Sequence, residues 1–421
     1  MAWAFLIVSL LGIAHALNAL APRKGPVIVF GLSFFASWLT LELAWHHLIM
    51  GLVWTALFVS QGALDSPVGE VALGLMALTE MILVKVALTG RRTRVLMGGA
   101  LVDLEPSPEA PRFPLSHVIF PFLIGRRRGV RLVRNIPFAR VGGRTLRLDV
   151  TLPTAAVPGG GAKRPALMQI HGGGWVIGDK REQGVPLLTH MAAQGWVGFN
   201  VNYRLSPAAS FPDHLVDLKA ALRWIREHAD DYEIDRDFIC VTGGSAGGHL
   251  AALVGLTAGN PRFQPGFEAA DTTVAAAVPF YGIYDFTPQG AFGDDPEIYR
   301  RFLEPMVMKA FVEDEPERYI EASPIHHLTP DAPPFLVIHG DKDTLAPVED
   351  ARRFVERLTA ISRQPVIYAE MQGAQHAFDV FPSARAAKVI EGVERFLSTL
   401  WERRHESRRA LEADLAEALT E

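Results

Sequence analysis

The sequence predicts an α/β fold, a mostly parallel sheet with helices on both faces, preceded by an all-α transmembrane region. Three features of the 421-residue chain indicate this arrangement. An excess of apolar residues is confined to residues 1–90. The remainder alternates uninterrupted apolar runs with helical stretches, as expected for parallel strands that helices bury on both sides. Two alternating segments joined by Gly142-Gly143 come before these runs and indicate an antiparallel start to the sheet.

Charge and cysteine content exclude several classes of protein. The net charge of −5 and the pI of about 6.3 give no electrostatic basis for binding nucleic acid. The single cysteine, Cys240, excludes an intrachain disulfide framework and a zinc site built from several cysteines. We therefore expect no nucleic-acid partner.

Three apolar segments in residues 1–94 predict membrane-spanning helices. Segments 1–20 and 68–90 each hold about 20 mostly apolar residues, which as helices match a hydrocarbon core about 30 Å thick. The middle segment, 27–61, is too long for one straight span and rather short for two. We expect it to form a helical hairpin that turns near residues 42–47, giving about four spans. Three spans with one long tilted helix are the alternative.

Two features of this region have a second interpretation. A cleaved signal peptide is disfavoured because residues 1–20 lack a basic start and a cleavage site, and because more apolar segments follow. Glu42, His46 and His47 would mark an intramembrane site in one interpretation and a hairpin tip at the membrane interface in the other. We expect the hairpin tip.

Basic residues indicate the side of the membrane on which the chain continues. Arginines within 91–94 and 126–128 favour a cytoplasmic position for the domain that follows. Arg23 and Lys24 also favour the cytoplasm, yet four spans place their loop on the opposite side from 91–94, and only three spans reconcile the two loops. We expect a multi-pass membrane protein with the downstream domain on the cytoplasmic face.

Residues 95–130 are expected to form a linker or a cap segment, because residues 103–115 are rich in proline and acid. The α/β domain is expected at 131–400. Its expected strands are 130–140, 144–153, 165–170, 197–203, 237–243, 273–282, 333–340 and 365–372, and its expected helices are 182–194, 213–228, 246 onward, 347–361 and 383–400. An irregular and helical stretch, 284–327, interrupts this alternation. Residues 401–421 are charged and predict a solvated or loosely docked helix.

A serine among glycines follows one of these strands. Residues Gly243–Gly247 fit the pattern G-x-S-x-G around Ser245. Glycine costs about 0.5–1 kcal/mol relative to alanine in a regular element, so the cluster indicates a geometric need. In a nucleophile elbow the serine sits on a strained strand-to-helix turn, and small neighbours let helix and strand pass closely. A phosphate-binding loop and a plain tight turn remain alternatives on these residues alone.

An earlier glycine turn supplies the backbone N–H groups that such a serine needs. Residues 171–175, His-Gly-Gly-Gly-Trp, follow the strand expected at 165–170. This is the HGGG-type turn that pairs with a G-x-S-x-G serine. Two N–H groups from this turn and one from Ala246 would face a developing oxyanion, and losing one such donor costs about 10²–10³ in rate. Its position at the end of a strand disfavours the alternative, an ordinary glycine loop.

Candidates for an acid and a base follow in the order that accompanies a nucleophile elbow. Asp341 and Asp343 follow one expected strand, and His376 follows the last. Open parallel sheets bind ligands at the carboxyl ends of their strands, so these groups can converge on Ser245. The residues alone leave the choice between the two aspartates open. His339, which ends the strand before the aspartates, is expected to satisfy backbone groups.

The motifs HGGGW, GGSAGG, HGDKD and QHAF, in this order, resemble those of the α/β-hydrolase superfamily. The chain is similar in particular to hormone-sensitive-lipase-type carboxylesterases and related bacterial esterases over about residues 130–400, and VNYRLSP at 201–207 adds to the likeness. The resemblance implies an α/β-hydrolase fold with Ser245 as nucleophile, His376 as base, Asp343 as the acid, and Gly173, Gly174 and Ala246 as oxyanion donors.

The chain departs from the family's pattern at two places. His376-Ala377-Phe378 stands where many members have His-Gly-Phe. Membrane segments and residues 95–130 replace the family's usual N-terminal cap, so that the source of a lid is open. We expect the lid within residues 284–327.

The resemblance implies a serine hydrolase that cleaves carboxylic esters through an acyl-enzyme and needs no metal or organic cofactor, and the apolar segments of residues 1–90 predict that it is anchored in a membrane. A site close to the bilayer favours lipophilic esters or lipids, so an ester substrate and the lipid bilayer are the expected partners. The sequence leaves the natural substrate and the oligomeric state open. An amidase, deacetylase or formamidase of the same architecture is one alternative, and a membrane interaction module with an inactive hydrolase domain is another. A transporter built from residues 1–90 has too few spans and midplane polar groups.

Overall fold

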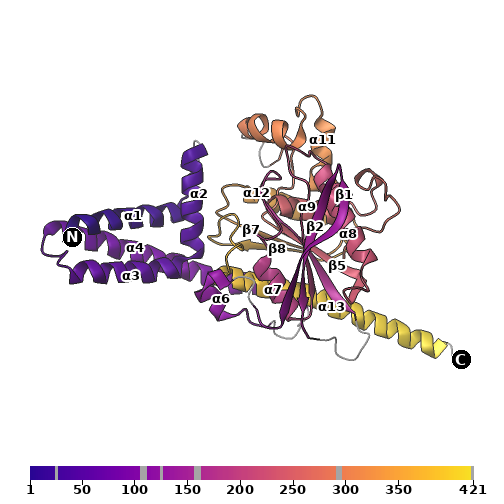
Figure 1. Cartoon of the computed structure of the whole chain (residues 1–421), viewed down its shortest axis with the longest axis horizontal. Helices are drawn as coiled ribbons and strands as arrows, with labels where there is room; N and C mark the ends of the chain where they lie inside the picture. The colour runs from indigo at the N-terminus through magenta and orange to yellow at the C-terminus, as the bar shows by residue number, and fades with distance from the viewer. Residues whose placement is uncertain (24–26, 105–110, 124–126, 156–162, 291–295, 419–421) are drawn as a thin grey trace.

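The structure has two parts (Figure 1). The apolar N-terminal residues form a helical bundle, and the rest of the chain forms an α/β domain. The computed structural model describes all residues except 24–26, 105–110, 124–126, 156–162, 291–295 and 419–421. Outside the described residues therefore lie the basic residues Lys24 and Arg126, the centre of the expected linker, part of the expected lid and the end of the charged tail.

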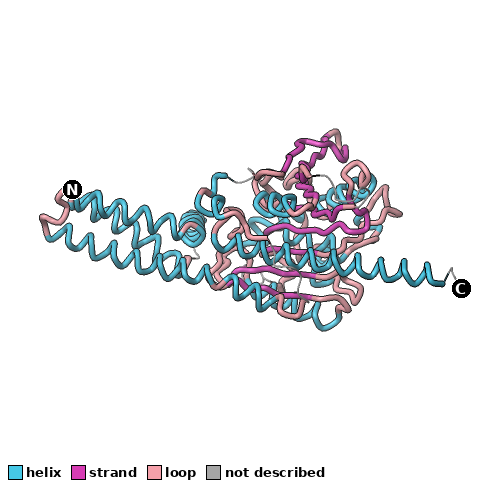
Figure 2. The backbone as a smooth tube through the Cα atoms, turned by 90° about the horizontal axis from the view of Figure 1, so that it is seen from below, coloured by secondary structure: helices cyan, strands magenta, loops and turns pink. Residues whose placement is uncertain are grey.

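Four helices form the N-terminal part: α1 (Ala2–Leu20), α2 (Val27–Glu42), α3 (Ala44–Ser60) and α4 (Pro67–Arg91). Helices α1, α3 and α4 run side by side, and α2 crosses them at the end nearest the α/β domain (Figures 1 and 2). Small buried residues, Ala16 and Ala19 on α1 and Ala72 on α4, allow the helices to approach closely. Phe5 stacks on Phe58 with 5.1 Å between ring centroids.

Two of the described helices are long and apolar enough to cross a membrane, Ala2–Leu20 and Pro67–Ala100. The pair Gly31–Glu42 and Ala44–Ser60 qualifies together as a third span, although it is bent by 89°. A break is therefore present where we expected one, but it is a right-angle bend and neither a hairpin nor one tilted helix. By length and composition the described helices thus give two candidate spans, or three if the bent pair counts as one, where we expected about four.

The physical reason for the bend lies in the α/β domain. Glu42, the last residue of α2, is buried, and its carboxylate accepts hydrogen bonds from Ser383 Oγ at 2.6 Å and from Arg385 Nε at 3.1 Å. These contacts hold α2 across the end of the bundle, where it continues into α3 only after a sharp turn at Leu43. Glu42 is therefore not the hairpin-tip residue that we expected but one partner of a buried ion pair.

The described residues of the expected linker pack on the α/β domain. They form α5 (Thr93–Ala100), α6 (Leu115–Ile119) and a 3-10 turn (Pro121–Leu123). Met97, Leu101 and Phe113 are buried in the core cluster on one face of the sheet. The N–H of Phe113 also donates to Glu391 Oε1 at 3.0 Å. This segment thus extends the helical layer that covers the sheet.

Eight strands form one sheet in the order β1-β2-β4-β3-β5-β6-β7-β8. They are β1 (Val130–Val141), β2 (Arg144–Pro153), β3 (Arg164–Ile170), β4 (Val197–Val201), β5 (Ile234–Gly244), β6 (Ala277–Phe280), β7 (Phe335–Gly340) and β8 (Val366–Met371). Strands β1, β2 and β4 pair antiparallel, with Val150 opposite Phe199, and all other pairs are parallel. The observed sheet confirms the predicted fold class.

Helices cover both faces of the sheet: α7 (Val185–Ala193), α8 (Asp213–Glu227), α9 (Ala246–Leu256), α12 (Val348–Ile361) and α13 (Ala384–Ala418). Leu215, Leu250 and Phe354, from α8, α9 and α12, belong to the core cluster of one face. Leu187 and Ile390, from α7 and α13, belong to the cluster of the other face. Each helix buries an apolar stripe against strands that are apolar on both sides.

Helix α13 is longer than expected. The structure has one helix of 35 residues where we expected a helix at 383–400 and a separate, charged helix at 401–421. The ring of Trp401 lies 4.9 Å from the ring of Phe238, and Arg404 lies 3.9 Å from Asp235. These contacts hold the part of the helix just beyond residue 400 on the α/β domain, and the helix then extends past the sheet (Figure 2).

Short helical segments fill the stretch between β6 and β7 that we expected to supply a lid. The described residues there form α10 (Pro296–Ile298), a π-helix (Tyr299–Met308), α11 (Pro316–Glu321) and a 3-10 turn (Pro324–His326). Another 3-10 turn, Pro261–Phe263, follows α9. In the π-helix Tyr299, Leu303 and Val307 are buried in the core of the α/β domain, so that this segment is packed on the domain that it overlies.

Candidate active site

Ser245 lies at the junction of β5 and α9, between Gly244, the last residue of the strand, and Ala246, the first residue of the helix. Its backbone has φ 60° and ψ −124°, which residues with a side chain rarely adopt. The N–H of Ser245 donates to the carbonyl oxygen of Phe280 in β6 at 3.0 Å, which ties the turn to the neighbouring strand. The serine therefore sits on a strained strand-to-helix turn.

The glycines of this turn are required by close backbone contacts. A Cβ atom on Gly243 would overlap the carbonyl oxygen of Gly247, and one on Gly247 would overlap the carbonyl oxygen of Ile170. A Cβ atom on Gly248 would overlap the carbonyl oxygen of Phe280. Helix α9 thus starts directly against strands β3 and β6, and only glycine fits between them.

His376 and Asp343 form a buried pair on the loops after β8 and β7. His376 Nδ1 lies 2.6 Å from Asp343 Oδ2, and both side chains are buried. The second oxygen of Asp343 accepts the N–H groups of Leu345 and Ala346, each at 2.8 Å. Burial by itself would raise the pKa of Asp343, but the neighbouring His376 and the hydrogen bonds to the carboxylate outweigh burial and lower the pKa below its ordinary value. The carboxylate is thus ionised and oriented toward the imidazole.

His339 contributes to this environment in a way that the sequence did not indicate. Its Nε2 bonds the carbonyl oxygen of Ala346 at 2.9 Å, which is the backbone role that we expected. The same nitrogen lies 3.4 Å from Asp343 Oδ2. A second imidazole therefore stands beside the acid, and the strand position of His339 alone gave no signal of it.

Asp341, the other aspartate of the loop, has a separate function. Its Oδ1 accepts the N–H of Gly373 at 2.6 Å, and the residue is exposed. This hydrogen bond connects the loop after β7 with the loop after β8 at the protein surface. The structure thus brings Asp343, and not Asp341, to His376.

The serine turn and His376 are connected through the residue that follows β6. Ser245 bonds to Phe280, and the ring of the next residue, Tyr281, lies 4.6 Å from the His376 ring. The Tyr281 hydroxyl donates to Asp379, a partly buried residue whose pKa is raised above its ordinary value by desolvation. The described residues include no hydrogen bond between the side chains of Ser245 and His376. Sequence reasoning missed Tyr281 and Asp379, because neither belongs to the motifs.

The glycine turn after β3 runs beside the serine. A Cβ atom on Gly172 would stand 3.0 Å from the Cβ of Ser245, so that the two backbones touch. Gly173 and Gly174 have φ values of 111° and 57°, which favour glycine. No other described residue accepts a hydrogen bond from the N–H of Gly173, Gly174 or Ala246. These three groups are available to a ligand in the part of the chain that the structure describes.

Side chains outside the motif hold this turn in place. Gln183 Oε1 accepts the N–H of Gly172 at 2.7 Å. The Tyr203 hydroxyl donates to the carbonyl oxygen of His171 at 3.0 Å, and Trp175 Nε1 donates to His249 Nδ1 at 3.1 Å. Tyr203 lies in the VNYRLSP segment, so its contact gives that segment a structural function. Gln183 carried no signal in the sequence.

Phe302 of the π-helix lies over the glycine turn. Its ring would come within 3.1 Å of a Cβ atom on Gly174. The described part of the expected lid therefore reaches the candidate oxyanion site with an aromatic side chain. Residues 291–295 of that stretch lie outside the described residues.

The sequence of this chain is similar to a known protein family and to several named proteins. The family description BD-FAE matches residues 148–358. Over 242 residues the chain is 50% identical to the probable carboxylic ester hydrolase LipM of Mycobacterium tuberculosis, an alignment that covers 57% of this chain and 56% of that protein. Over 321 residues it is 42% identical to esterase LipQ of the same organism, and this alignment covers 76% of this chain and 71% of that protein. The chain thus spans between about half and three quarters of the length of these relatives.

The chain is also similar in structure to a solved esterase. The propionate-bound esterase Est2 of the planctomycete Thermogutta terrifontis has a TM-score of 0.53 and 26% sequence identity with this chain. The match covers 64% of this chain and 94% of that chain.

Proposed function

This chain belongs to the hormone-sensitive-lipase-like carboxylesterases of the α/β-hydrolase superfamily, and we propose that it hydrolyses carboxylic esters with Ser245, His376 and Asp343 as its catalytic triad. The observation that carries the proposal is the buried pair of His376 Nδ1 and Asp343 Oδ2 at 2.6 Å, on the loops after β8 and β7. The strained turn that presents Ser245 at the end of β5 gives further support.

The proposed reaction proceeds in two steps. Ser245 Oγ attacks the ester carbonyl carbon while His376 Nε2 takes the hydroxyl proton, and the alcohol then leaves with that proton. Water next attacks the acyl-enzyme, with His376 again as base, and releases the carboxylic acid and free Ser245. Asp343 keeps the Nδ1 proton of His376 in place, so that Nε2 is free to accept. All groups in this scheme belong to the protein, the ester or water.

Charge that develops on the carbonyl oxygen needs donors fixed in advance. The N–H groups of Gly173, Gly174 and Ala246 supply them in this proposal. They are not engaged by other described residues, and their backbones are held by Gln183 and by the start of α9. Donors that do not have to reorganise stabilise the oxyanion most effectively.

Lipophilic esters or lipids are the proposed substrates, at the surface of a bilayer. The apolar bundle of α1, α3 and α4 ends directly beside the α/β domain, and α2 contacts the loop that carries His376 (Figure 1). The Phe302 ring next to Gly174 adds an apolar wall at the site. We place the catalytic domain on the cytoplasmic face, since the arginines at 91–94 precede it.

Substitution of the serine tests the reaction. We expect Ser245→Ala to lower kcat for p-nitrophenyl esters by at least about 10⁴-fold, because it removes the nucleophile. Turnover should be measured from acetyl to long-chain acyl groups, with Ser407→Ala on the exposed part of α13 as the control that keeps activity. A fluorophosphonate should label the control and not Ser245→Ala. Retained activity in Ser245→Ala would sink the assignment, and preferred turnover of matched amides would favour the amidase alternative.

Topology is tested by thiol labelling. Cys240, the single cysteine, is fully buried, so a cysteine introduced at the exposed Glu356 provides the accessible thiol. In intact cells we expect a membrane-impermeant maleimide to modify Glu356→Cys only after the cells are opened. Modification in intact cells would place the domain on the outer face.

A further inference from the structure

The loop that carries His376 is held from outside the α/β domain by helix α2. Trp38 Nε1 donates to the carbonyl oxygen of Ala377 at 2.9 Å, and its ring stacks on Phe381 with centroids 4.9 Å apart. One residue earlier on α2, Ser37 Oγ accepts from Gln375 Nε2 at 3.5 Å. Residues on both sides of His376 therefore contact the same helix.

The backbone at Ala377 explains why such a hold is needed. Ala377 has φ 59°, in the left-handed region that favours glycine, and it directly follows the candidate base. A residue with a Cβ atom stays in this region only when its surroundings fix it. The carbonyl oxygen of that strained residue accepts two hydrogen bonds, the one from Trp38 Nε1 and one from the N–H of Val380 at 3.2 Å, and only the bond from Trp38 comes from outside the loop.

We propose that Trp38 is a positioning residue for His376, an inference that rests on the proposed esterase function. The Trp38 indole keeps Ala377 in its strained conformation, and this conformation aims the imidazole of His376. Gln375 supports the same geometry, because its Oε1 accepts the N–H of His376 at 2.9 Å and that of Thr344, next to Asp343, at 2.8 Å. The bundle is thereby a part of the catalytic apparatus and not only an anchor.

The substitution Trp38→Phe removes the N–H donor and keeps a ring for Phe381. We expect kcat for a p-nitrophenyl ester, per site titrated with fluorophosphonate, to fall about tenfold with KM nearly unchanged. Adding Ala377→Gly to Trp38→Phe should restore most of kcat, because glycine adopts the left-handed conformation without strain. Trp3→Phe, at an exposed position on α1, is the matched control and should keep wild-type kcat.

An unchanged kcat per titrated site in Trp38→Phe would overturn the proposal, as would the absence of rescue by Ala377→Gly. Titration per site separates these results from partial unfolding, which lowers the number of sites and not their rate. Failure of the esterase proposal is distinguishable, since wild type itself would then show no turnover that depends on Ser245.

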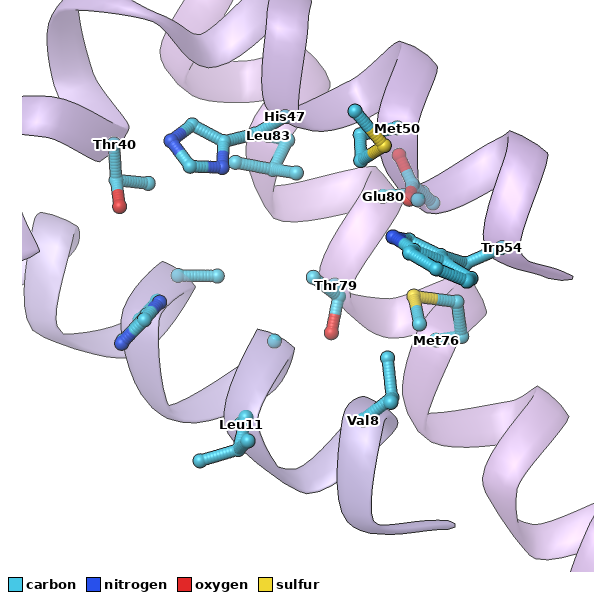
Figure 3. A pocket seen from close by; sticks show the side chains of 14 residues that line it. Val8, Leu11, Thr40, His47, Met50, Trp54, Met76, Thr79, Glu80 and Leu83 are labelled. Carbon is cyan, nitrogen blue, oxygen red and sulfur yellow. The ribbon is translucent and has the colours of Figure 1, made fainter. Parts of the chain in front are cut away.

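A different observation concerns a cavity of about 190 Å³ inside the bundle (Figure 3). Apolar side chains form most of its wall, and Glu80, His15 and His47 bring polar groups to it. Both carboxylate oxygens of Glu80 are buried, and neither has a hydrogen-bond partner among the described residues. A Cβ atom on Gly51 would overlap Glu80 Oε1, so glycine at this position leaves room for the Glu80 carboxylate.

The rim of the cavity indicates where a ligand enters. Leu11, Met50 and Trp54 line the cavity and are exposed on the outside of the bundle. In a bilayer this outside faces lipid, so the ligand is an amphiphile that partitions from the hydrocarbon phase. An unpaired carboxylate in such surroundings is costly and needs a donor. A fatty acid would bring a second carboxylate, whereas a hydroxyl group brings the missing donor.

We infer that this cavity binds the hydroxyl head of a single-chain lipid, such as a long-chain alcohol. The probe is a long-chain alcohol with a photoactivatable diazirine near its hydroxyl group, added to the full chain in phosphatidylcholine vesicles. We expect labelled peptides from α3 and α4, and competition by unlabelled alcohol but not by fatty acid of equal chain length.

Paired substitutions test the site. Gly51→Ala places a Cβ atom where Glu80 Oε1 lies and so displaces the carboxylate, whereas Gly74→Ala on α4 has nothing within 4 Å of the added Cβ atom. We expect Gly51→Ala and Glu80→Leu to lower labelling at least about fivefold, and Gly74→Ala and Glu70→Leu to leave it unchanged. Fluorophosphonate labelling of Ser245 checks that each variant is folded. Equal labelling in Gly51→Ala and Gly74→Ala, or stronger competition by fatty acid, would overturn the inference.

Discussion

At the scale of single residues, the candidate site depends on how completely Asp343 is satisfied. One carboxylate oxygen accepts two backbone N–H groups, and the other faces His376 and His339. An ion with so many partners keeps its charge and its direction even when buried. The imidazole of His376 is consequently held in one tautomer, with Nδ1 as donor.

The first prediction at this scale is catalytic. In Asp343→Asn the amide NH₂ can donate to His376 Nδ1, which moves the imidazole proton to Nε2 and removes the base. We expect kcat for ester hydrolysis to fall about 10⁴-fold, as for other triads that lose this carboxylate. Asp341→Asn, in the same loop but exposed, should change kcat less than about threefold. Equal losses in the two variants would contradict the assigned acid.

The second prediction concerns stability against pH. The pKa of Asp343 is lowered in the folded protein, while in the unfolded chain an aspartate titrates near about 3.9. Its carboxylate thus stabilises the fold above about pH 3.9, and this stabilisation is lost as the pH falls through the folded pKa. The difference in free energy of unfolding between wild type and Asp343→Asn should shrink from about pH 5 to about pH 2, measured by urea titration. A constant difference would contradict the lowered pKa.

At the scale of elements, the π-helix Tyr299–Met308 sets the shape of the site through Phe302. We expect Phe302→Ala to raise kcat/KM for octanoyl relative to acetyl p-nitrophenyl ester about three- to tenfold, because it removes a ring beside Gly174. Phe311→Ala changes an exposed phenylalanine of the same stretch and serves as the control. Unchanged chain-length preference in Phe302→Ala would mean that the ring does not face the substrate.

Elements that follow from local pattern were predictable, and those that depend on distant partners were not. Short local motifs predict the strands and the serine turn. Each candidate site residue, whether Ser245 with its glycines, His376 or one of the two aspartates, directly follows a predicted strand. The bend after Glu42 depends on Arg385, more than 300 positions away, and the length of α13 depends on Trp401 meeting Phe238. Tyr281 contacts the His376 ring, and Gln183 accepts the N–H of Gly172. Neither contact can be predicted from the spacing of residues in the sequence.

At the scale of the whole molecule, one buried ion pair joins the bundle to the α/β domain. Arg385 Nε lies 3.1 Å from Glu42 Oε1, both side chains are buried, and Arg385 also donates to the carbonyl oxygens of Gln372 and Gly373 at 2.7 and 3.0 Å. The pair thus connects α2 with the turn that leads into the histidine loop. Relative motion of the two parts requires this pair to open.

Removal of one partner should be costly. We expect Arg385→Met to lower the free energy of unfolding by about 3–5 kcal/mol, because Glu42 is then left buried and unpaired. The double variant Glu42→Met/Arg385→Met should recover much of that loss, since neither charge remains. Thermal unfolding of the full chain in detergent micelles measures both. A double variant that loses as much as the two single variants together would show that the ions are not coupled.

The right-angle crossing of α2 has a consequence for kinetics. If the bundle spans a bilayer as proposed, a domain held across its end stays at a fixed height and orientation and would meet the proposed lipid esters by lateral diffusion in two dimensions. Its rate should then follow the mole fraction of the ester in the vesicle and not its bulk concentration. Added inert phospholipid at constant total ester would slow such an enzyme by surface dilution alone. The hydrolysis rate of short soluble esters would not change with added phospholipid.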